Sequence, residues 1–206
     1  MTSTRTYFEK HARTVDRQYT DGNGARRFLQ PGPLLGLKHA VSVANRYAAP
    51  TCLDVGCGTG RVAEAVMDAG AVRYVGIDLS PRMLAYARAR LEQFDAVELH
   101  EGDFLDLDVP QTFDVVLALG LFDYLEDPSR AADWLRARCS STLVASFTRW
   151  DWVKGPIRHL HYDVVHRCRV FDYTEARVQA LLTGAGFSTV ELVLHGRRGF
   201  IVEAAP

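Results

Sequence analysis

The chain has 206 residues, of which 48% are hydrophobic and 24% are charged, an ordinary balance for one globular domain of this length. Such a length buries enough surface for the chain to fold without a disulfide or a structural metal. The formal net charge of −1 excludes nucleic-acid binding through bulk positive charge, although it leaves a local basic patch open.

The cysteines and the N-terminus predict a cytoplasmic protein. No two cysteines form a C-x-x-C pair and none matches a zinc spacing, so we expect free thiols in a reducing compartment. The cysteines are Cys52, Cys57, Cys139 and Cys168. The opening MTSTRTYFEKHARTVDR lacks the apolar core of a secretory signal. No apolar run approaches ~18 residues, so we expect neither a membrane span nor a membrane partner.

Hydrophobic periodicity predicts two helices, over 5–19 and 34–48, followed by a regular alternation of strands and helices. Strands are expected over 51–56, 73–78, 96–103, 113–120, 142–147, 187–196 and 199–206. Further helices are expected over 61–70, 80–94, 127–139 and 172–186. This alternation predicts an α/β fold, with a parallel sheet covered by helices on both faces. The last two strands, joined by a tight turn, predict an antiparallel addition at one edge.

The stretch LDVGCGTGR, residues 53–61, places Gly56, Gly58 and Gly60 directly after the first expected strand. A tight turn without a ligand needs one glycine, whereas three predict a loop whose backbone a ligand approaches closely. The dinucleotide pattern G-x-G-x-x-G fails because Arg61 occupies the third glycine position. Asp54, just before the loop, would repel a pyrophosphate but can position a positively charged ligand.

Two more acids stand at the ends of the following strands. Asp78 lies about 20 residues beyond the first glycine, where a carboxylate can hold both hydroxyls of a ribose. The alternative is an acid at the N-terminus of the helix that begins near Ser80. Asp103 ends the third strand beside Phe104, and a carboxylate next to an aromatic ring suits the amine and the ring of adenine.

The motifs LDVGCGTG, GIDLSPRMLAYAR, EGDF and FDVVLALGLFDYLED, in this order over residues 50–205, resemble the class I S-adenosylmethionine-dependent methyltransferases of small-molecule type. The resemblance implies a doubly wound seven-stranded sheet of order 3-2-1-4-5-7-6, with the last strand antiparallel. It also implies a helical lid over residues 1–49 and a cofactor domain over 50–206. In the lid, Tyr7, His11 and Tyr19 can close over the cofactor; a plain amphipathic helix covering the sheet edge is the alternative.

The cofactor implied by this resemblance is S-adenosylmethionine. The glycine loop would pack against its methionine part, Asp54 would orient its amino group directly or through water, and Asp78 would bind the ribose. Leu119 and Gly120 would border the methionyl end. The full set implied for cofactor binding is Asp54, Gly56, Cys57, Gly58, Gly60, Asp78, Leu79, Met83, Asp103, Phe104, Leu119 and Gly120. Leu79 and Met83 would line the base pocket, and Asp103 with Phe104 would face adenine.

The sequence says less about the residues that would face the methyl acceptor. After the fourth strand the chain reads Phe122-Asp123-Tyr124 where many family members carry a His-His-Leu type segment, which puts a histidine base at this place in doubt. Asp123 or Tyr124 can face the acceptor. The alternative is that Asp123 caps a short helix and Tyr124 packs.

The insert over residues 149–170 combines five basic and two acidic residues with Trp150, Trp152 and Tyr162. Aromatic rings with cations suit a planar or anionic small molecule, so we expect the insert to roof the acceptor pocket. The alternative is a solvated basic face. An unperturbed imidazole titrates at about pH 6.5 and can act as a general base. The candidate bases are His159, His161 and His166. No carboxylate pattern accompanies them, so we expect no metal.

We therefore predict methyl transfer from S-adenosylmethionine to a small-molecule acceptor by in-line displacement, with oxygen favoured over nitrogen or carbon. An RNA or protein methyltransferase is the alternative. Against it stand the neutral charge and the sequence ALGLFDY where base aminomethylases often carry an Asn/Asp-Pro-Pro-Tyr segment. A non-catalytic S-adenosylmethionine-binding protein is the third possibility. We expect no nucleic-acid partner and either a monomer or a homodimer.

Overall fold

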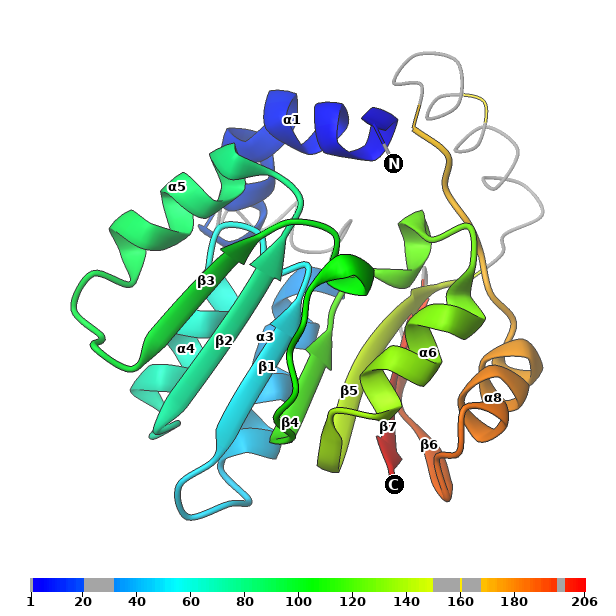
Figure 1. Ribbon diagram of the computed structural model, residues 1–206. Helices are drawn as coiled ribbons and strands as arrows, with labels where there is room; N and C mark the ends of the chain where they lie inside the picture. Colours follow the sequence, from blue (N-terminus) through cyan, green and yellow to red (C-terminus); the bar gives the residue numbers. More distant parts are fainter. Residues whose placement is uncertain (1, 21–31, 150–159, 161–167, 196–198) are drawn as a thin grey trace.

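The computed structural model describes residues 2–20, 32–149, 160, 168–195 and 199–206 (Figure 1). The helices are α1 (Thr2–Thr20), α3 (Gly32–Ala44), α4 (Arg61–Asp68), α5 (Pro81–Arg90), α6 (Pro128–Arg136) and α8 (Glu175–Gly184). The strands are β1 (Thr51–Val55), β2 (Arg73–Asp78), β3 (Val97–Glu101), β4 (Phe113–Ala118), β5 (Cys139–Thr148), β6 (Thr189–His195) and β7 (Gly199–Ala205). Two short 3₁₀ helices, η1 (Phe104–Asp106) and η2 (Phe122–Tyr124), follow β3 and β4.

The strands form one sheet of order β3-β2-β1-β4-β5-β7-β6, which confirms the predicted topology. Strands β1 to β5 pair in parallel, whereas β7 runs antiparallel to both β5 and β6. Strand β1 lies between β2 and β4. From β1 the chain runs outward through β2 and β3 on one side, and it then returns to form β4 on the other side of β1. Ligands of doubly wound folds bind at the carboxyl end of the sheet where the strand order reverses in this way. The glycine loop leaves β1 at that point.

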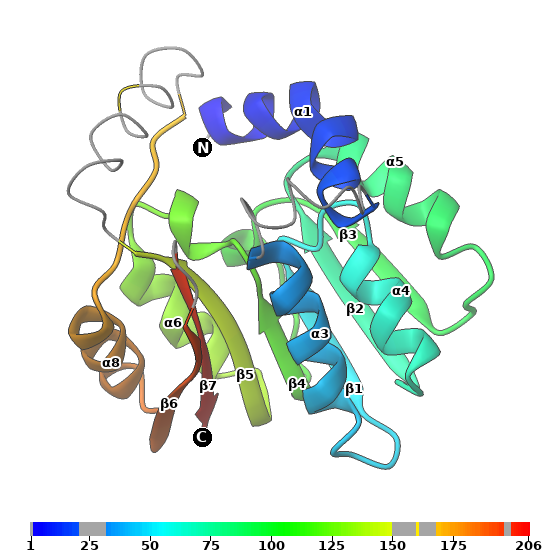
Figure 2. The same cartoon turned by 180° about the vertical axis from the view of Figure 1, so that it is seen from behind.

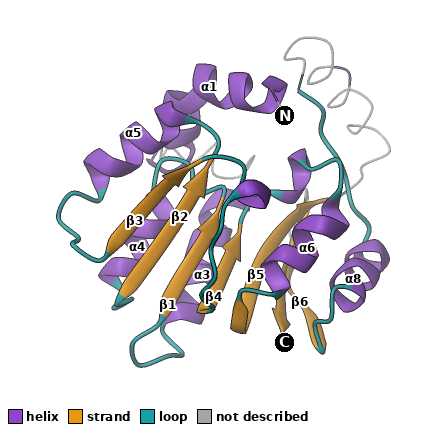
Figure 3. Cartoon of the chain, in the orientation of Figure 1, coloured by secondary structure: helices purple, strands orange, loops and turns teal. Residues whose placement is uncertain are grey.

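Helices cover both faces of the sheet, as Figures 1 and 2 show from opposite sides and Figure 3 shows by element type. On one face α3, α4 and α5 bury apolar side chains such as Val43, Val66 and Leu84. On the other face α6 and α8 bury Leu135 and Leu182. Neighbouring residues of β1 point to opposite faces, and both faces are covered, so burial along this strand is continuous rather than alternating.

Side-chain caps fix where three of the helices begin. Ser80 accepts a hydrogen bond from the backbone N–H of Met83, and Pro81 follows at the first helical position, as the sequence predicted. Asp127 and Thr174 cap α6 and α8 in the same way. Strand β5 begins at Cys139, three residues earlier than the predicted 142–147, because Cys139 pairs with Phe113 of β4.

Helix α1 crosses the carboxyl ends of β2 and β3 and packs against α5 (Figures 1 and 2). Its Ala12 is fully buried, whereas Lys10 and Arg13 are exposed. The helix therefore covers the edge of the sheet that carries the glycine loop. None of the described helices has the length and apolar character required to cross a bilayer.

Candidate functional site

The glycine loop adopts a backbone that only glycine takes up readily. Gly56, Gly58 and Gly60 have φ angles of 81°, 55° and 76°, all in the left-handed region. The backbone N–H groups of Gly56 and Cys57 donate to the carbonyl of Ile77, at 2.8 and 3.1 Å. The loop is therefore held against the end of β2, and its three glycines are required by conformation.

Two of these glycines differ in what surrounds them. A Cβ at Gly60 would lie 3.1 Å from the backbone of Ala87, so this glycine lets α5 pack closely against the loop. A Cβ at Gly58 would meet only the carbonyl of Gly56, at 4.0 Å. Gly58 therefore leaves its backbone open, which is what a closely approaching ligand requires.

Asp78 ties the open part of the loop to the end of β2. Its Oδ2 accepts the N–H of Gly58 at 2.9 Å, and its Oδ1 accepts the N–H of Ser80 at 2.8 Å. Burial raises the pKa of Asp78, although these two N–H donors oppose the shift. A carboxylate has about four lone-pair sites, so each oxygen can still accept a hydroxyl of a ligand.

Asp54 lies beneath the loop and is only 2% exposed. Tyr74 donates its hydroxyl to Asp54 Oδ2 at 2.7 Å. Burial raises the pKa of Asp54 to about 7, the Tyr74 hydrogen bond lowers it, and the charge of Asp78 adds to the rise. This position favours an indirect influence on a bound ammonium group, through water or the loop, over direct contact.

Of the residues expected around adenine, Leu79 and Asp103 remain partly exposed, whereas Phe104 is 5% exposed. Asp103 caps η1 by accepting the N–H of Leu105 at 3.1 Å. The ring of Phe104 packs edge to face against Trp134, with centroids 5.2 Å apart. The η1 turn thus places most of this ring in the core, where burial of an aromatic ring is favourable, and its contact with adenine stays a prediction.

Met83 is 1% exposed on α5, so its side chain also belongs to the interior. At the other end of the predicted cofactor path, a Cβ at Gly120 would meet nothing within 4 Å. Leu119 lies against Gly36 of α3. Ser146 of β5, which is not among the residues predicted from the sequence, accepts the N–H of Gly120 at 2.8 Å. A hydroxyl near the carboxyl end of a strand, within the apolar stretch that follows Thr142, was the available signal.

Asp123 joins η2 to the end of β5 and to the segment before α8. Its two carboxylate oxygens accept the N–H and the hydroxyl of Thr148, at 3.0 and 2.5 Å. Its backbone carbonyl accepts the N–H of Phe171 at 2.8 Å. Tyr124 packs edge to face against Phe8 of α1, with centroids 5.0 Å apart. These contacts favour the structural alternative for Asp123 over a role as base.

Replacing Asp123 by Ala is therefore expected to lower the free energy of unfolding by about 2–4 kcal/mol, because two hydrogen bonds to a carboxylate are lost. Urea denaturation measures this loss. The control is Asp127→Ala, which removes an exposed helix cap and should cost only about 1 kcal/mol. An Asp123→Ala variant as stable as wild type would contradict the structural role.

The three candidate histidines of the insert, together with Trp150, Trp152 and Tyr162, lie outside the described residues. The two described ends of the insert, at Arg149 and Cys168, contact neighbouring elements of the fold. Arg149 lies over the ring of Phe200 at 5.7 Å and pairs with Glu175. Cys168 is buried and its thiol lies 3.8 Å from the hydroxyl of Thr4 in α1. Within the described parts of the chain, no cluster of His, Cys, Asp or Glu is arranged to hold a metal.

The predicted lid residues on α1 are partly described. The ring of His11 stacks on Tyr7 with centroids 4.5 Å apart, and His11 Nδ1 lies 2.8 Å from the carbonyl of Tyr7. A carbonyl only accepts, so Nδ1 is the donor in this contact. The side chain of Tyr19 lies outside the described part of the structure.

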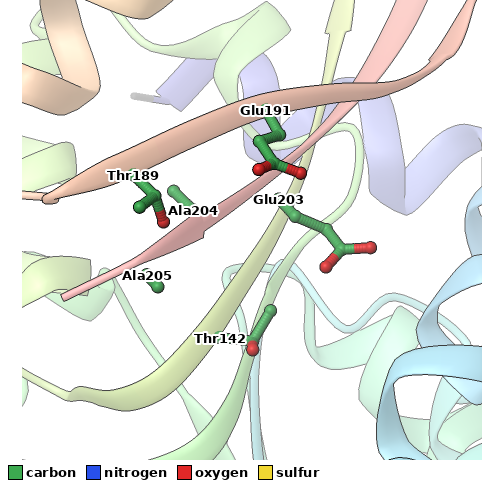
Figure 4. A pocket seen from close by; sticks show the side chains of 6 residues that line it. All are labelled: Thr142, Thr189, Glu191, Glu203, Ala204 and Ala205. Carbon is green, nitrogen blue, oxygen red and sulfur yellow. The ribbon is translucent and has the colours of Figure 1, made fainter.

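A pocket of about 130 Å³ lies at the β6 edge of the sheet, where Glu191 of β6 is paired with Glu203 of β7 (Figure 4). Its lining consists of Thr142, Thr189, Glu191, Glu203, Ala204 and Ala205. Thr142 stands in the first half of β5, away from the carboxyl end of the sheet. Glu203 already accepts hydrogen bonds from His39 and Arg46. The glycine loop therefore remains the candidate functional site.

A family model described as a methyltransferase domain matches residues 52–140, from β1 to the start of β5. Over 116 residues the chain is 28% identical to malonyl-(acyl-carrier protein) O-methyltransferase of Acetivibrio thermocellus, covering 56% of this chain and 41% of that protein. Over 89 residues it is 44% identical to cypemycin N-terminal methyltransferase of a Streptomyces species, covering 43% and 34%. The chain thus spans less than half the length of these curated relatives.

Among solved structures, magnesium protoporphyrin IX methyltransferase from Synechocystis PCC 6803 with bound SAH matches with a TM-score of 0.74. The match covers 99% of this chain and 98% of that one at 22% identity, so it shows a shared fold. The matched family model contains the glycine loop, Asp78 and Asp103, and the sheet has the strand order that this fold requires. Residues 52–140 therefore match a methyltransferase domain, and the chain as a whole shares the fold of the methyltransferase of known structure.

Proposed function

We propose that the chain transfers the methyl group of S-adenosylmethionine to a small-molecule acceptor. The observation that supports this most is the pairing of Gly58 with Asp78. The loop N–H is held by the carboxylate at 2.9 Å, and the space above Gly58 is open. Such a pair offers backbone to one part of a nucleoside ligand and a carboxylate to its ribose.

In this proposal the chain's own residues bind and orient the methyl donor. The glycine loop, including Cys57, holds the methionine part, and Asp54 supplies negative potential beneath the amino group. Leu79 and Asp103 serve the adenine end. The open space at Gly120 borders the methionyl end, with Leu119 beside it. The bound donor supplies a sulfonium-linked methyl group, and holding an acceptor in line with that methyl is the main catalytic task of the protein.

For the acceptor we propose a planar or anionic small molecule, with oxygen favoured as the methylated atom. The names of the matched relatives include both an O-methyltransferase and an N-terminal methyltransferase. Candidate acceptors with oxygen and with nitrogen atoms should therefore both be assayed. We propose His159, His161 or His166 as the general base, with Tyr124 next. Asp123 ranks last because the two hydrogen bonds that its carboxylate accepts from Thr148 favour a structural role.

We also propose that residues 1–49 act as a lid over the cofactor domain of residues 50–206, with residues 149–170 on the acceptor side. The packing of α1 against α5, above the strand ends, supports the first part. We propose a monomer or homodimer without a nucleic-acid partner.

Two experiments test the function in sequence. Calorimetry should show binding of S-adenosylmethionine and S-adenosylhomocysteine but not of NAD. An assay for S-adenosylhomocysteine formation against a metabolite pool, a protein extract and an RNA pool then separates the acceptor classes. Binding without turnover on any pool would favour a non-catalytic binding protein, and turnover confined to RNA or protein would reject the small-molecule proposal.

The binding of S-adenosylhomocysteine is expected to strengthen as the pH rises from 6 to 8. The pKa of Asp54 lies at about 7, so the carboxylate that attracts the ligand's ammonium group forms over this interval. Below pH 7 the affinity should fall by at most about tenfold per pH unit. Calorimetry across this range measures the trend.

The control is Asp54→Asn, which should bind with little dependence on pH in the same interval. The contribution of Asp54 to folding stability is expected to change with pH in the opposite direction to ligand affinity. Folded Asp54 keeps its proton up to about pH 7, whereas an unfolded Asp loses it near ~3.9, so this group lowers stability as the pH rises between the two values. An equal pH slope in wild type and Asp54→Asn would rule out Asp54 as its source.

A further inference from the structure

Asp16, near the C-terminal end of α1, contacts the glycine loop although it is far from it in sequence. Its Oδ1 accepts the hydroxyl of Thr59, which stands between Gly58 and Gly60, at 2.9 Å. Thr59 is only 3% exposed, so this is a buried hydroxyl satisfied by a residue of the lid. The contact joins α1 directly to the loop that we propose to hold the cofactor.

Two arginines complete the arrangement around this carboxylate. Arg61, at the start of α4, reaches both oxygens of Asp16 at 3.1 and 3.2 Å. Arg90, at the end of α5, lies 3.0 Å from Oδ1 and also donates to the backbone carbonyl of Thr59. Burial by itself raises the pKa of Asp16, but the hydrogen bonds from Arg61 and Thr59 and the charge of Arg90 outweigh it, so the pKa is lowered.

The other end of α1 is anchored separately. Arg5 pairs with Glu101 at the end of β3 at 3.0 Å, and Phe8 meets Tyr124 of η2. Helix α1 thus spans the strand ends from the acceptor side to the glycine loop (Figure 1). Its Arg5–Glu101 pair is half exposed, whereas the side chain of Asp16 is 18% exposed. The Asp16 contact is the buried anchor, and it is the one that touches the loop.

We infer that Asp16 is a positioning residue for the cofactor. It fixes Thr59 and closes α1 over the glycine loop, so that a bound cofactor leaves only when this anchor opens. The inference rests on the proposed function, because it assigns a role at the same cofactor site. It predicts that Asp16 controls how fast the ligand dissociates, beyond its contribution to stability.

The test compares Asp16→Asn with Glu203→Gln on the full chain, using S-adenosylhomocysteine as the probe. Glu203 is a matched control, because its side chain is 14% exposed, it is held by Arg46 and His39, and it lies away from the loop. Stopped-flow displacement should show dissociation about tenfold faster in Asp16→Asn, the equivalent of one hydrogen bond to a charged group. In Glu203→Gln the rate should stay within about twofold of wild type, even if thermal stability falls equally.

Thr59→Val provides a second variant, because it keeps the shape of the side chain and removes only the hydroxyl. It should speed dissociation in the same direction by a smaller factor. Hydrogen exchange of α1 should also slow when the ligand binds wild type, and slow less in Asp16→Asn. Dissociation from Asp16→Asn as slow as from wild type would overturn the inference. Failure of wild type to bind the probe would instead overturn the proposed function, and the inference with it, before any variant is compared.

Discussion

Replacing Asp78 by Ala is expected to weaken the binding of S-adenosylhomocysteine by ~10²–10⁴-fold. Two ribose hydroxyls would lose their carboxylate acceptor, and each hydrogen bond to a charged group contributes about 1.5–3 kcal/mol before relaxation. The same substitution removes the acceptor of the Gly58 and Ser80 N–H groups, so the loop is no longer held to the end of β2. Both effects act in the same direction, and calorimetry on the folded variant measures their sum.

Asp114→Ala separates ligand binding from general stability. Asp114 is also a partly buried carboxylate, and it accepts the N–H and the hydroxyl of Thr51 at 2.9 and 2.8 Å. Asp114 lies near the amino end of β4 and Thr51 at the amino end of β1, so this contact is at the opposite end of the strands from the glycine loop. Its loss should reduce stability and leave affinity unchanged. Unchanged affinity in Asp78→Ala would remove the ribose assignment.

The strands and helices followed from the sequence because the physical causes of these elements are local. Strands buried on both faces give short apolar runs, helices with a covered face give helical spacing, and the motif resemblance supplied the order of the strands. The glycine loop is equally local, because its left-handed φ angles leave little choice of residue. The start of β5 was missed because Ser140 and Ser141 interrupt the apolar pattern, while the pairing of Cys139 with Phe113 is made across the sheet.

The roles of individual site residues depended on partners that no local pattern reveals. An aspartate beside an aromatic ring is compatible with adenine binding, yet the ring of Phe104 lies against Trp134 of α6. Asp123 could be a base or a structural residue, and the deciding partner, Thr148, is at the end of β5. The contact of Asp16 with Thr59 is likewise tertiary.

Gly58→Val is expected to abolish measurable binding of S-adenosylhomocysteine while the chain still folds. A branched side chain would project into the open space above the loop, where only the carbonyl of Gly56 comes within 4.0 Å of a Cβ. The left-handed backbone at this position adds a strain of about 1–2 kcal/mol, which a domain of ordinary stability tolerates. Circular dichroism should therefore show a native spectrum with a modestly lower melting temperature.

The matched pair Gly58→Ala and Gly60→Ala isolates the role of space from that of backbone strain. Both substitutions add one methyl group at a left-handed φ, of 55° and 76°. At Gly60 the methyl would lie 3.1 Å from Ala87 and Leu91, so the cost should appear mainly in the free energy of unfolding. At Gly58 the neighbouring atoms leave room, so the cost should appear mainly in ligand affinity. Full binding by a well-folded Gly58→Val would refute the close approach of a ligand to this backbone. Backbone strain changes only the free energy of unfolding, whereas the added side chain fills the space that the ligand is proposed to occupy.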